Sequence, residues 1–228
     1  MTKPSLSELH QKILVSIVDK GSAPTVRGLA ESLCCTVRAI RQSLRALEDW
    51  HGVVLHRHND EIWIAHPFSL APTNFLVRSK TREWWANCAW CSLGVAALVG
   101  GEVQITTTLG ANDKQITIEV TDGEVSQPDL LVHFPTPMSR VWDNVIYSCS
   151  MMLVFQTEEQ INMWCSAHNV AKGDIKRLAA LYPFAAEWYG GHLDLNWKKW
   201  TVSEAQELMD RHGFSGPIWS LPTDKNRF

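Results

Sequence analysis

Several features that define large classes of protein are missing from this chain. No apolar run reaches the ~18 residues that a membrane-spanning helix needs, and the first residues lack the apolar core of a signal peptide. The sequence also contains no Gly-rich phosphate loop, no Ser/His/Asp signature and no paired Cys-x-x-Cys motifs with zinc spacing. We therefore expect a cytoplasmic protein that makes no membrane contact and requires no resident cofactor.

A strong excess of either charge is absent as well. The 228 residues include 21 Lys and Arg against 24 Asp and Glu, which gives a net charge of −3. This balance disfavours a protein that binds nucleic acid mainly through its total charge. The length is enough for one large or two small domains with a sizeable core, and we place the boundary between residues 1–80 and 81–228.

Cysteine, in contrast, is well represented. In a reducing compartment the six cysteines are expected to be free thiols, available as metal ligands or nucleophiles rather than as a disulfide framework. Soft metal ions prefer such thiolates to nitrogen or oxygen ligands. The cysteines therefore direct the search for function to residues 34, 35, 88, 91, 149 and 165.

The first part of the chain has the pattern of a winged helix-turn-helix. Residues 5–66 contain three segments with helical apolar spacing, followed by two strand-like segments on either side of an Asn59-Asp60 turn. The third helix has Arg38, Arg41 and Arg45 along one side, which is typical either of a DNA recognition helix or of a solvated basic face. The low charge favours the second interpretation, and residues 67–80 are predicted to be a linker.

The second part predicts an α+β domain. A strongly apolar helix is expected from Glu83 to Val99, ended by Gly100-Gly101. Strands are predicted at 103–109, 115–120, 130–134 and about 151–155, and helices at about 139–146, 158–167, 175–188 and 203–212.

Two of the cysteines lie in segments with a recognisable pattern. Cys91 lies in Ala89-Trp90-Cys91-Ser92-Leu93-Gly94, and Cys149 lies in Tyr147-Ser148-Cys149-Ser150-Met151. Phe155 follows six residues after Cys149. This arrangement resembles the alkylmercury (organomercurial) lyase family. The resemblance implies a domain with an antiparallel sheet and flanking helices, covered by an N-terminal helical domain. It also implies that Cys91 and Cys149 are the catalytic, mercury-binding thiols.

The resemblance departs from the family at the catalytic aspartate, whose position is Gly94 here. Turnover is therefore in question, and Gly94→Asp is expected to raise the rate of carbon–mercury cleavage. We regard Cys88, Trp90 and Gly94 as auxiliary positions of the site, because Cys88 is three residues before Cys91. Polar residues that a folded C-terminus could place over the site are Glu187, Tyr189, His192 and Asp194, and Glu83 lies two helical turns before Cys91.

Three functions are consistent with these features. The first is binding, and cleavage, of an organomercurial, with mercury or another soft metal as substrate or ligand. The second is a lyase-fold enzyme acting on another small molecule, in which the missing side chain at Gly94 makes room for substrate. The third is a soft-metal-binding protein without turnover, or a transcriptional regulator.

Overall fold

The N-terminal helices begin at residues suited to capping. The computed structural model describes residues 3–111 and 114–222, and its first helices are α1 (Leu6–Lys20), α2 (Val26–Ser32) and α3 (Val37–Asp49). The hydroxyls of Ser5, Thr25 and Thr36 each accept a hydrogen bond from the backbone N–H three residues on, which satisfies a donor that the helix leaves unpaired. The helices pack through apolar residues onto a short hairpin of β1 (Val53–Leu55) and β2 (Ile62–Ala65).

A single antiparallel sheet connects this helical part to the rest of the chain. After β2 come β3 (Phe68–Ser69), β4 (Phe75–Arg78), β5 (Glu83–Ala86), β6 (Val103–Thr108), β7 (Gln115–Thr121) and β8 (Glu124–Val125). They pair in the order β1-β2-β3-β5-β4-β6-β7-β8. Residues 67–80, predicted as a linker, thus contain two strands of the sheet. The mixture of helices with antiparallel sheet agrees with the predicted α+β class.

The apolar helix that carries Cys91 is shorter than its pattern predicted. Residues Glu83–Ala86 form β5, whose alternating burial is that of a strand, and helix α4 covers only Ala89–Val99. Cys88 is the N-cap and Gly100 ends the helix, as expected. The prediction of a helix from Glu83 was wrong because the apolar Trp84 and Ala86 belong to a strand. Over so few residues the apolar pattern of a strand cannot be distinguished from that of a helix. Nearly every residue of α4 is buried.

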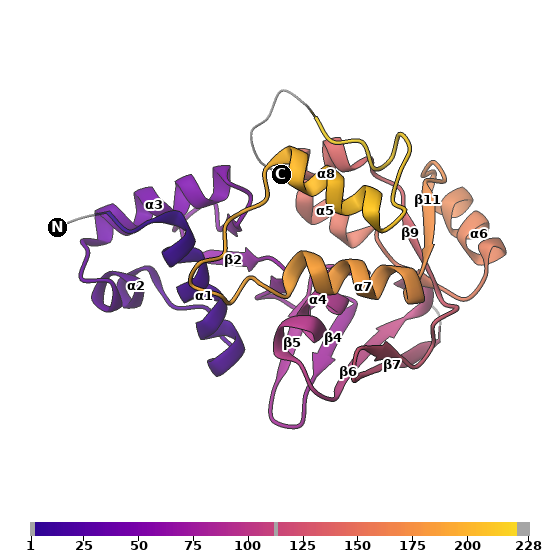
Figure 1. The fold of residues 1–228 in the computed structure, drawn as a ribbon, viewed down its shortest axis with the longest axis horizontal. Helices are drawn as coiled ribbons and strands as arrows, with labels where there is room; N and C mark the ends of the chain where they lie inside the picture. The colour runs from indigo at the N-terminus through magenta and orange to yellow at the C-terminus, as the bar shows by residue number, and fades with distance from the viewer. Residues whose placement is uncertain (1–2, 112–113, 223–228) are drawn as a thin grey trace.

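The remaining elements build a second layer around α4. A small sheet places β9 (Leu131–Phe134) between β10 (Val154–Phe155) and β11 (Asp174–Arg177). The other elements are the 3-10 turns Leu109–Ala111 and Met138–Asp143, and helices α5 (Val145–Ser150), α6 (Glu158–His168), α7 (Leu178–Tyr189) and α8 (Val202–Arg211). Ile175, the predicted start of a helix, lies in β11, and the helix begins at Leu178. Figure 1 shows α7 running alongside α4.

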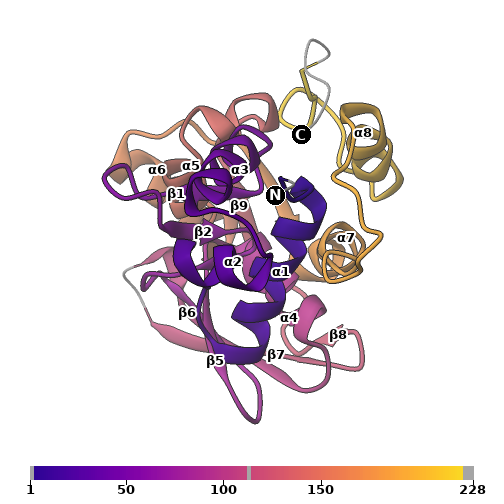
Figure 2. The same cartoon turned by 90° about the vertical axis from the view of Figure 1, so that its left-hand side faces the viewer.

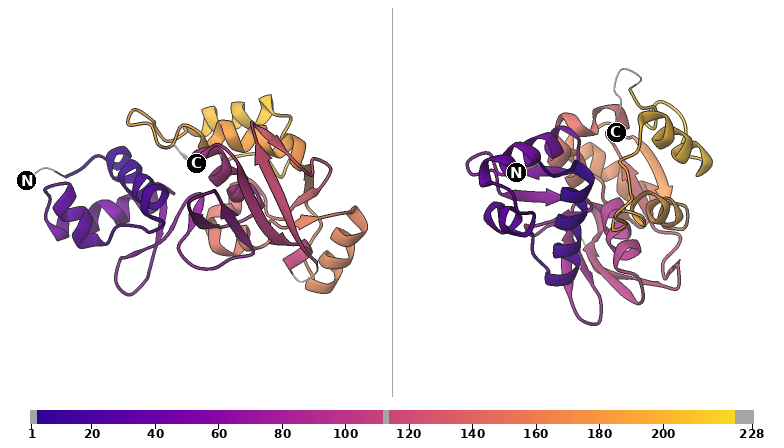
Figure 3. Two further views of the ribbon diagram at one scale, coloured as in Figure 1. Left: turned by 90° about the horizontal axis from the view of Figure 1, so that it is seen from below. Right: turned by 60° about the vertical axis from the view of Figure 1, so that its left-hand side comes forward.

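The segment between α7 and α8 returns to the N-terminal helices, as Figures 1 and 2 show. Gln11 donates a hydrogen bond to the Leu193 carbonyl at 3.3 Å, and Lys199 donates one to the His51 carbonyl at 3.3 Å. Trp84 Nε1 in β5 also donates to the Ile17 carbonyl of α1 at 2.9 Å. Figure 3 shows the N-terminal helices at one end of the molecule, with the α7–α8 segment reaching toward them. None of the described helices combines the length and apolarity that crossing a membrane requires.

The basic face of α3 is partly paired within the protein. Arg45 donates three hydrogen bonds of 3.1, 3.2 and 3.3 Å to the carboxylate of Asp60, and Arg41 lies 3.9 Å from the same group. Asp60 belongs to the predicted turn of the hairpin. The assignment of residues 5–66 as a winged helix-turn-helix remains a prediction, and so does the interpretation of Arg38, Arg41 and Arg45 as a solvated face with only weak, sequence-independent affinity for DNA.

Candidate thiol site

Cys91 lies in the first turn of α4, at the end of the helix where backbone N–H groups are unpaired. The Cys88 sulfur caps this end by accepting a hydrogen bond from the Cys91 N–H at 3.3 Å. The Cys91 side chain is 1% exposed. A helix N-terminus favours the thiolate over the thiol, because its dipole and free N–H groups stabilise negative charge.

Cys149 comes from α5 and meets Cys91 across the domain. Together with His66, which follows β2, the two cysteines place their ligand atoms within 4.8 Å of one another, and all three residues are buried. His66 Nδ1 lies 3.8 Å from Cys91 Sγ. Among the described residues, this group of potential ligands contains no carboxylate. The site therefore offers two sulfurs and one imidazole nitrogen to a single ligand.

The three thiols differ in their pKa values, and Cys91 is the most acidic of them. Burial alone would raise its pKa, but hydrogen bonds from Cys149, Cys88 and His66 outweigh this effect and hold the pKa of the Cys91 thiol well below its ordinary value. Burial raises the pKa of Cys88, and hydrogen bonding to the other two thiols, followed by burial, raises that of Cys149. Within this group the negative charge is therefore most favourable on Cys91, and the protons are held most strongly by Cys88 and Cys149.

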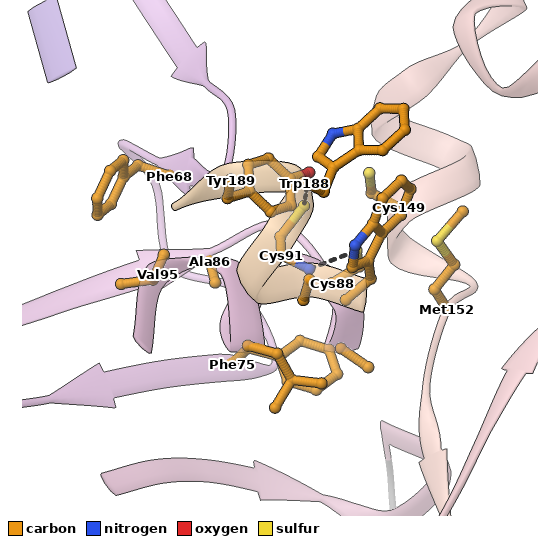
Figure 4. Close-up of a cluster of buried hydrophobic side chains, with 14 of the residues drawn as sticks. Phe68, Phe75, Ala86, Cys88, Cys91, Val95, Cys149, Met152, Trp188 and Tyr189 are labelled. Atoms are coloured by element: carbon orange, nitrogen blue, oxygen red, sulfur yellow. Dashed lines mark hydrogen bonds between the residues drawn. The ribbon is translucent and has the colours of Figure 1, made fainter. Parts of the chain in front are cut away.

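Tyr189, at the end of α7, fills the space beside Gly94. A Cβ atom added at Gly94 would lie 2.2 Å from Cδ2 of the Tyr189 ring, closer than any real contact. The ring places its hydroxyl 3.6 Å from Cys91 Sγ, as the dashed line in Figure 4 shows. Burial and the neighbouring thiolate raise the pKa of Tyr189 well above its ordinary value, so the hydroxyl is the donor. The missing side chain at Gly94 therefore makes room for Tyr189, and not for substrate.

Of the other predicted positions, Trp90 lines the cavity that contains the thiols, whereas Glu83 and Glu187 lie away from it. Trp90 is buried and stacks on Phe184 with ring centroids 5.1 Å apart, and its Nε1 has no hydrogen-bond partner among the described residues. Glu83 pairs with Arg78 at 2.8 Å on the surface, and Glu187 pairs with Arg211 and His212. Neither glutamate belongs to the cavity that contains the thiols.

That cavity lies between the N-terminal helices and the domain with α4. Its walls consist of three thiols, four imidazoles, large aromatic rings, one lysine and a few small or aliphatic residues. The thiols and imidazoles are Cys88, Cys91, Cys149, His10, His51, His66 and His192. The other lining residues are Trp90, Trp142, Trp188, Tyr189, Trp197, Lys199, Gly52, Val141, Val145 and Met152. Figure 4 shows Trp188, Tyr189 and Met152 around the cysteines. Sequence reasoning missed His66, which stands outside the matched pattern and is brought to the thiols only by the sheet.

Comparison with known proteins assigns this fold. Residues 68–190, more than half of the chain, match the alkylmercury lyase (MerB) family. The chain belongs to the alkylmercury lyase family. A solved structure entitled "Crystal structure of the mercury-bound form of MerB2" is 17% identical, with a TM-score of 0.68 over 84% of this chain and 93% of that one, which shows a shared fold. A search of curated proteins gave no match. His66 and the residues before it lie outside the matched segment of this alkylmercury lyase family member.

The buried imidazole of His10 predicts a loss of stability in acid. Burial, reinforced by the charge of Lys199, lowers the pKa of His10 to about 3. In the unfolded chain His10 binds a proton near pH 6.5, whereas in the folded protein it does not. The contribution of neutral, buried His10 to the free energy of unfolding is therefore fully present above pH 6.5 and decreases as the pH falls from there. Between pH 6.5 and 4.5, His10 alone should cost about 2–3 kcal/mol.

Urea unfolding at pH 7.5 and pH 4.5 measures this effect. The pH-dependent loss should be smaller by that amount in His10→Phe, whereas His58→Phe, at an exposed position, serves as the matched control. Equal losses in the native protein and His10→Phe would show that His10 does not carry the effect.

Proposed function

We propose that this protein binds organomercurials through Cys91 and Cys149 and cleaves their carbon–mercury bond. The single observation that supports this most strongly is the meeting of the two sulfurs with His66, within 4.8 Å, in a chain of the alkylmercury lyase family. Thiolates are the preferred ligands of a soft cation such as mercury. The Cys91 thiolate is available to attack mercury, and Cys149 is available as a second ligand.

The proposed reaction balances with the groups present. The Cys91 thiolate first bonds to mercury and displaces its exchangeable ligand. The carbon–mercury bond then breaks with its electron pair on carbon, which takes up a proton, while the Cys149 thiol loses its proton and its sulfur bonds to mercury. The products are the hydrocarbon and mercury held by two thiolates.

His66 is the proposed carrier of the proton from Cys149 to carbon. Its ring is close to both sulfurs, and Nδ1 faces Cys91. The amide of Asn87 lies 3.5 Å from Nδ1 but donates to the carbonyls of Pro67 and Phe68 at 3.3 Å each, so Nδ1 remains available for proton exchange. Nε2 is buried and has no hydrogen-bond partner among the described residues. General acid–base assistance of this kind needs a group within hydrogen-bond reach.

A specific observation favours a second function, retention of mercury without turnover. Cys88 lines the same cavity, and its sulfur accepts a hydrogen bond from the Cys91 N–H, so a third sulfur lies close to the two proposed ligands. Three thiolates would hold a soft metal more firmly than two and slow its release.

Stoichiometry separates the two functions. Phenylmercuric acetate is mixed with protein in the presence of excess small thiol, and benzene is measured by gas chromatography. The proposed enzyme should release several equivalents of benzene per protein, because the thiol removes mercury from Cys91 and Cys149 after each turnover. Cys34→Ser, which removes an exposed thiol, is the matched control and should behave like the native chain. Release that stops at one equivalent, or is absent, would support retention.

A further inference from the structure

The thiol cavity has a second, polar region built from other parts of the chain. His10 of α1 meets His192 and Trp197 of the α7–α8 segment, with ring centroids 5.4 Å apart for His10 and Trp197 and 3.9 Å apart for His192 and Trp197. His10 and His192 are 3% and 5% exposed. All three residues line the same cavity as Cys91 and Cys149.

The nitrogen atoms of this region lack partners in the protein. Both ring nitrogens of His10 and the Trp197 Nε1 are buried without a hydrogen bond among the described residues. Neither ring nitrogen of His192 has a hydrogen-bond partner among the described residues. Burial lowers the pKa of this imidazole, and the Trp188 backbone acts in the opposite direction. Buried polar groups are nearly always paired, because an unpaired one loses its bonds to water without replacement. Several such groups on one cavity wall indicate a bound polar ligand.

The charges around the cavity select the kind of ligand. No Asp or Glu is found among the described residues that line it, whereas Lys199 does line it. The positive charge of Lys199 reaches both imidazoles, since it contributes to lowering the pKa of His10 and of His192. The indole N–H and one N–H of each neutral imidazole are donors. A second metal cation would be repelled by Lys199, and an anionic acceptor would be attracted.

We propose that His10, His192, Trp197 and Lys199 bind a carboxylate on the organic part of the substrate, so that this protein prefers mercurated organic acids. This proposal rests on the proposed function, because it assigns the group at the far side of the bond that the thiols cleave. Trp188, Tyr189 and Trp90 line the cavity as well and provide flat apolar walls, which suit an aromatic ring in the substrate. The four residues lie outside residues 68–190, so this recognition belongs to the N-terminal helices and the C-terminal segment.

Two probes that differ only in the carboxylate test the proposal. 4-(Hydroxymercuri)benzoate and phenylmercuric hydroxide deliver the same arylmercury group with and without the acid. The native protein should show kcat/KM at least about tenfold higher for the benzoate, because N–H donors and a carboxylate form charge-assisted hydrogen bonds that the phenyl compound cannot make. In Trp197→Phe, which removes one N–H and keeps a ring, that ratio should fall severalfold, and in His10→Phe/His192→Phe it should approach one. His58→Gln should retain the native ratio.

Benzoate without mercury separates failure of this proposal from failure of the proposed function. It should quench tryptophan fluorescence in the native protein and do so more weakly in Trp197→Phe, whether or not carbon–mercury bonds are cleaved. Circular dichroism checks that the variants fold. Cleavage of both probes at equal rates, with no benzoate binding, would overturn the carboxylate site and leave the lyase function intact. A crystal structure with 4-(hydroxymercuri)benzoate that shows only water against His10 and Trp197 would overturn it as well.

Discussion

Replacing His66 by asparagine is expected to slow carbon–mercury cleavage by ~10²–10⁴, the usual contribution of a positioned acid–base group. Mercury binding to Cys91 and Cys149 should remain. The asparagine side chain places an amide near the position of Nδ1, which lies 3.8 Å from Cys91 Sγ, so a polar contact to the thiolate is kept. An amide does not exchange its proton with a thiol at neutral pH, and the transfer to carbon loses its carrier.

Single-turnover measurements separate the two effects. Protein in excess is mixed with phenylmercuric acetate, the reaction is quenched at intervals, and benzene is measured against the mercury bound. His66→Asn should show full binding with slow release of benzene. Cys91→Ser is the contrasting variant and should lose both, because it removes the attacking thiolate. If His66→Asn cleaves at the native rate, the proton comes from another group, and Tyr189→Phe becomes the decisive variant, since its hydroxyl is also near Cys91.

Much of the N-terminal architecture follows from local sequence. The helices begin where Ser5, Thr25 and Thr36 supply side-chain caps, and helix α4 ends at Gly100, where the sequence predicted its end. These features depend on residues within one helical turn of each other, and the physical chemistry of capping is the same in every fold. From Glu83 to Ala86 the few apolar residues are compatible with either a helix or a strand, and the sequence alone predicted a helix. Pairing with the neighbouring strands of the sheet makes this segment strand β5.

The composition of the site was only partly predictable for a different reason. Cys91 and Cys149 stand in segments whose pattern resembles the alkylmercury lyase family, so the sequence alone was enough to propose them as a pair. His66 approaches them because β2 and its neighbours form one sheet, and nothing within a few residues of His66 signals this. Likewise, the absence of a side chain at Gly94 is visible in the sequence, but the tyrosine that fills the space comes from the far end of α7.

Gly94→Asp is expected to destabilise the protein instead of accelerating it, which reverses the expectation drawn from the sequence. The new Cβ would lie 2.2 Å from the Tyr189 ring, and overpacking of this kind typically costs ~1–3 kcal/mol. The carboxylate would add negative charge beside the Cys91 thiolate in a buried site, where like charges repel strongly. Gly94→Ala, which adds the Cβ without the charge, separates the steric part from the electrostatic part in urea unfolding.

Removing the Tyr189 ring should reduce the destabilisation that Gly94→Asp causes. Tyr189→Ala alone leaves a cavity, and by analogy with other large aromatic truncations it should cost about 3–5 kcal/mol. In Gly94→Asp/Tyr189→Ala the aspartate gains the room that the ring vacates, so the double variant should be more stable than the sum of the single changes by about 0.5–3 kcal/mol. The double variant is also the one in which an aspartate next to Cys91 can reach the leaving carbon, and it should cleave phenylmercuric acetate faster than Gly94→Asp in a single turnover. If the changes in the free energy of unfolding simply add in the double variant, Tyr189 moves aside freely. If Gly94→Asp is as stable as the native protein and cleaves faster, the glycine limits proton delivery.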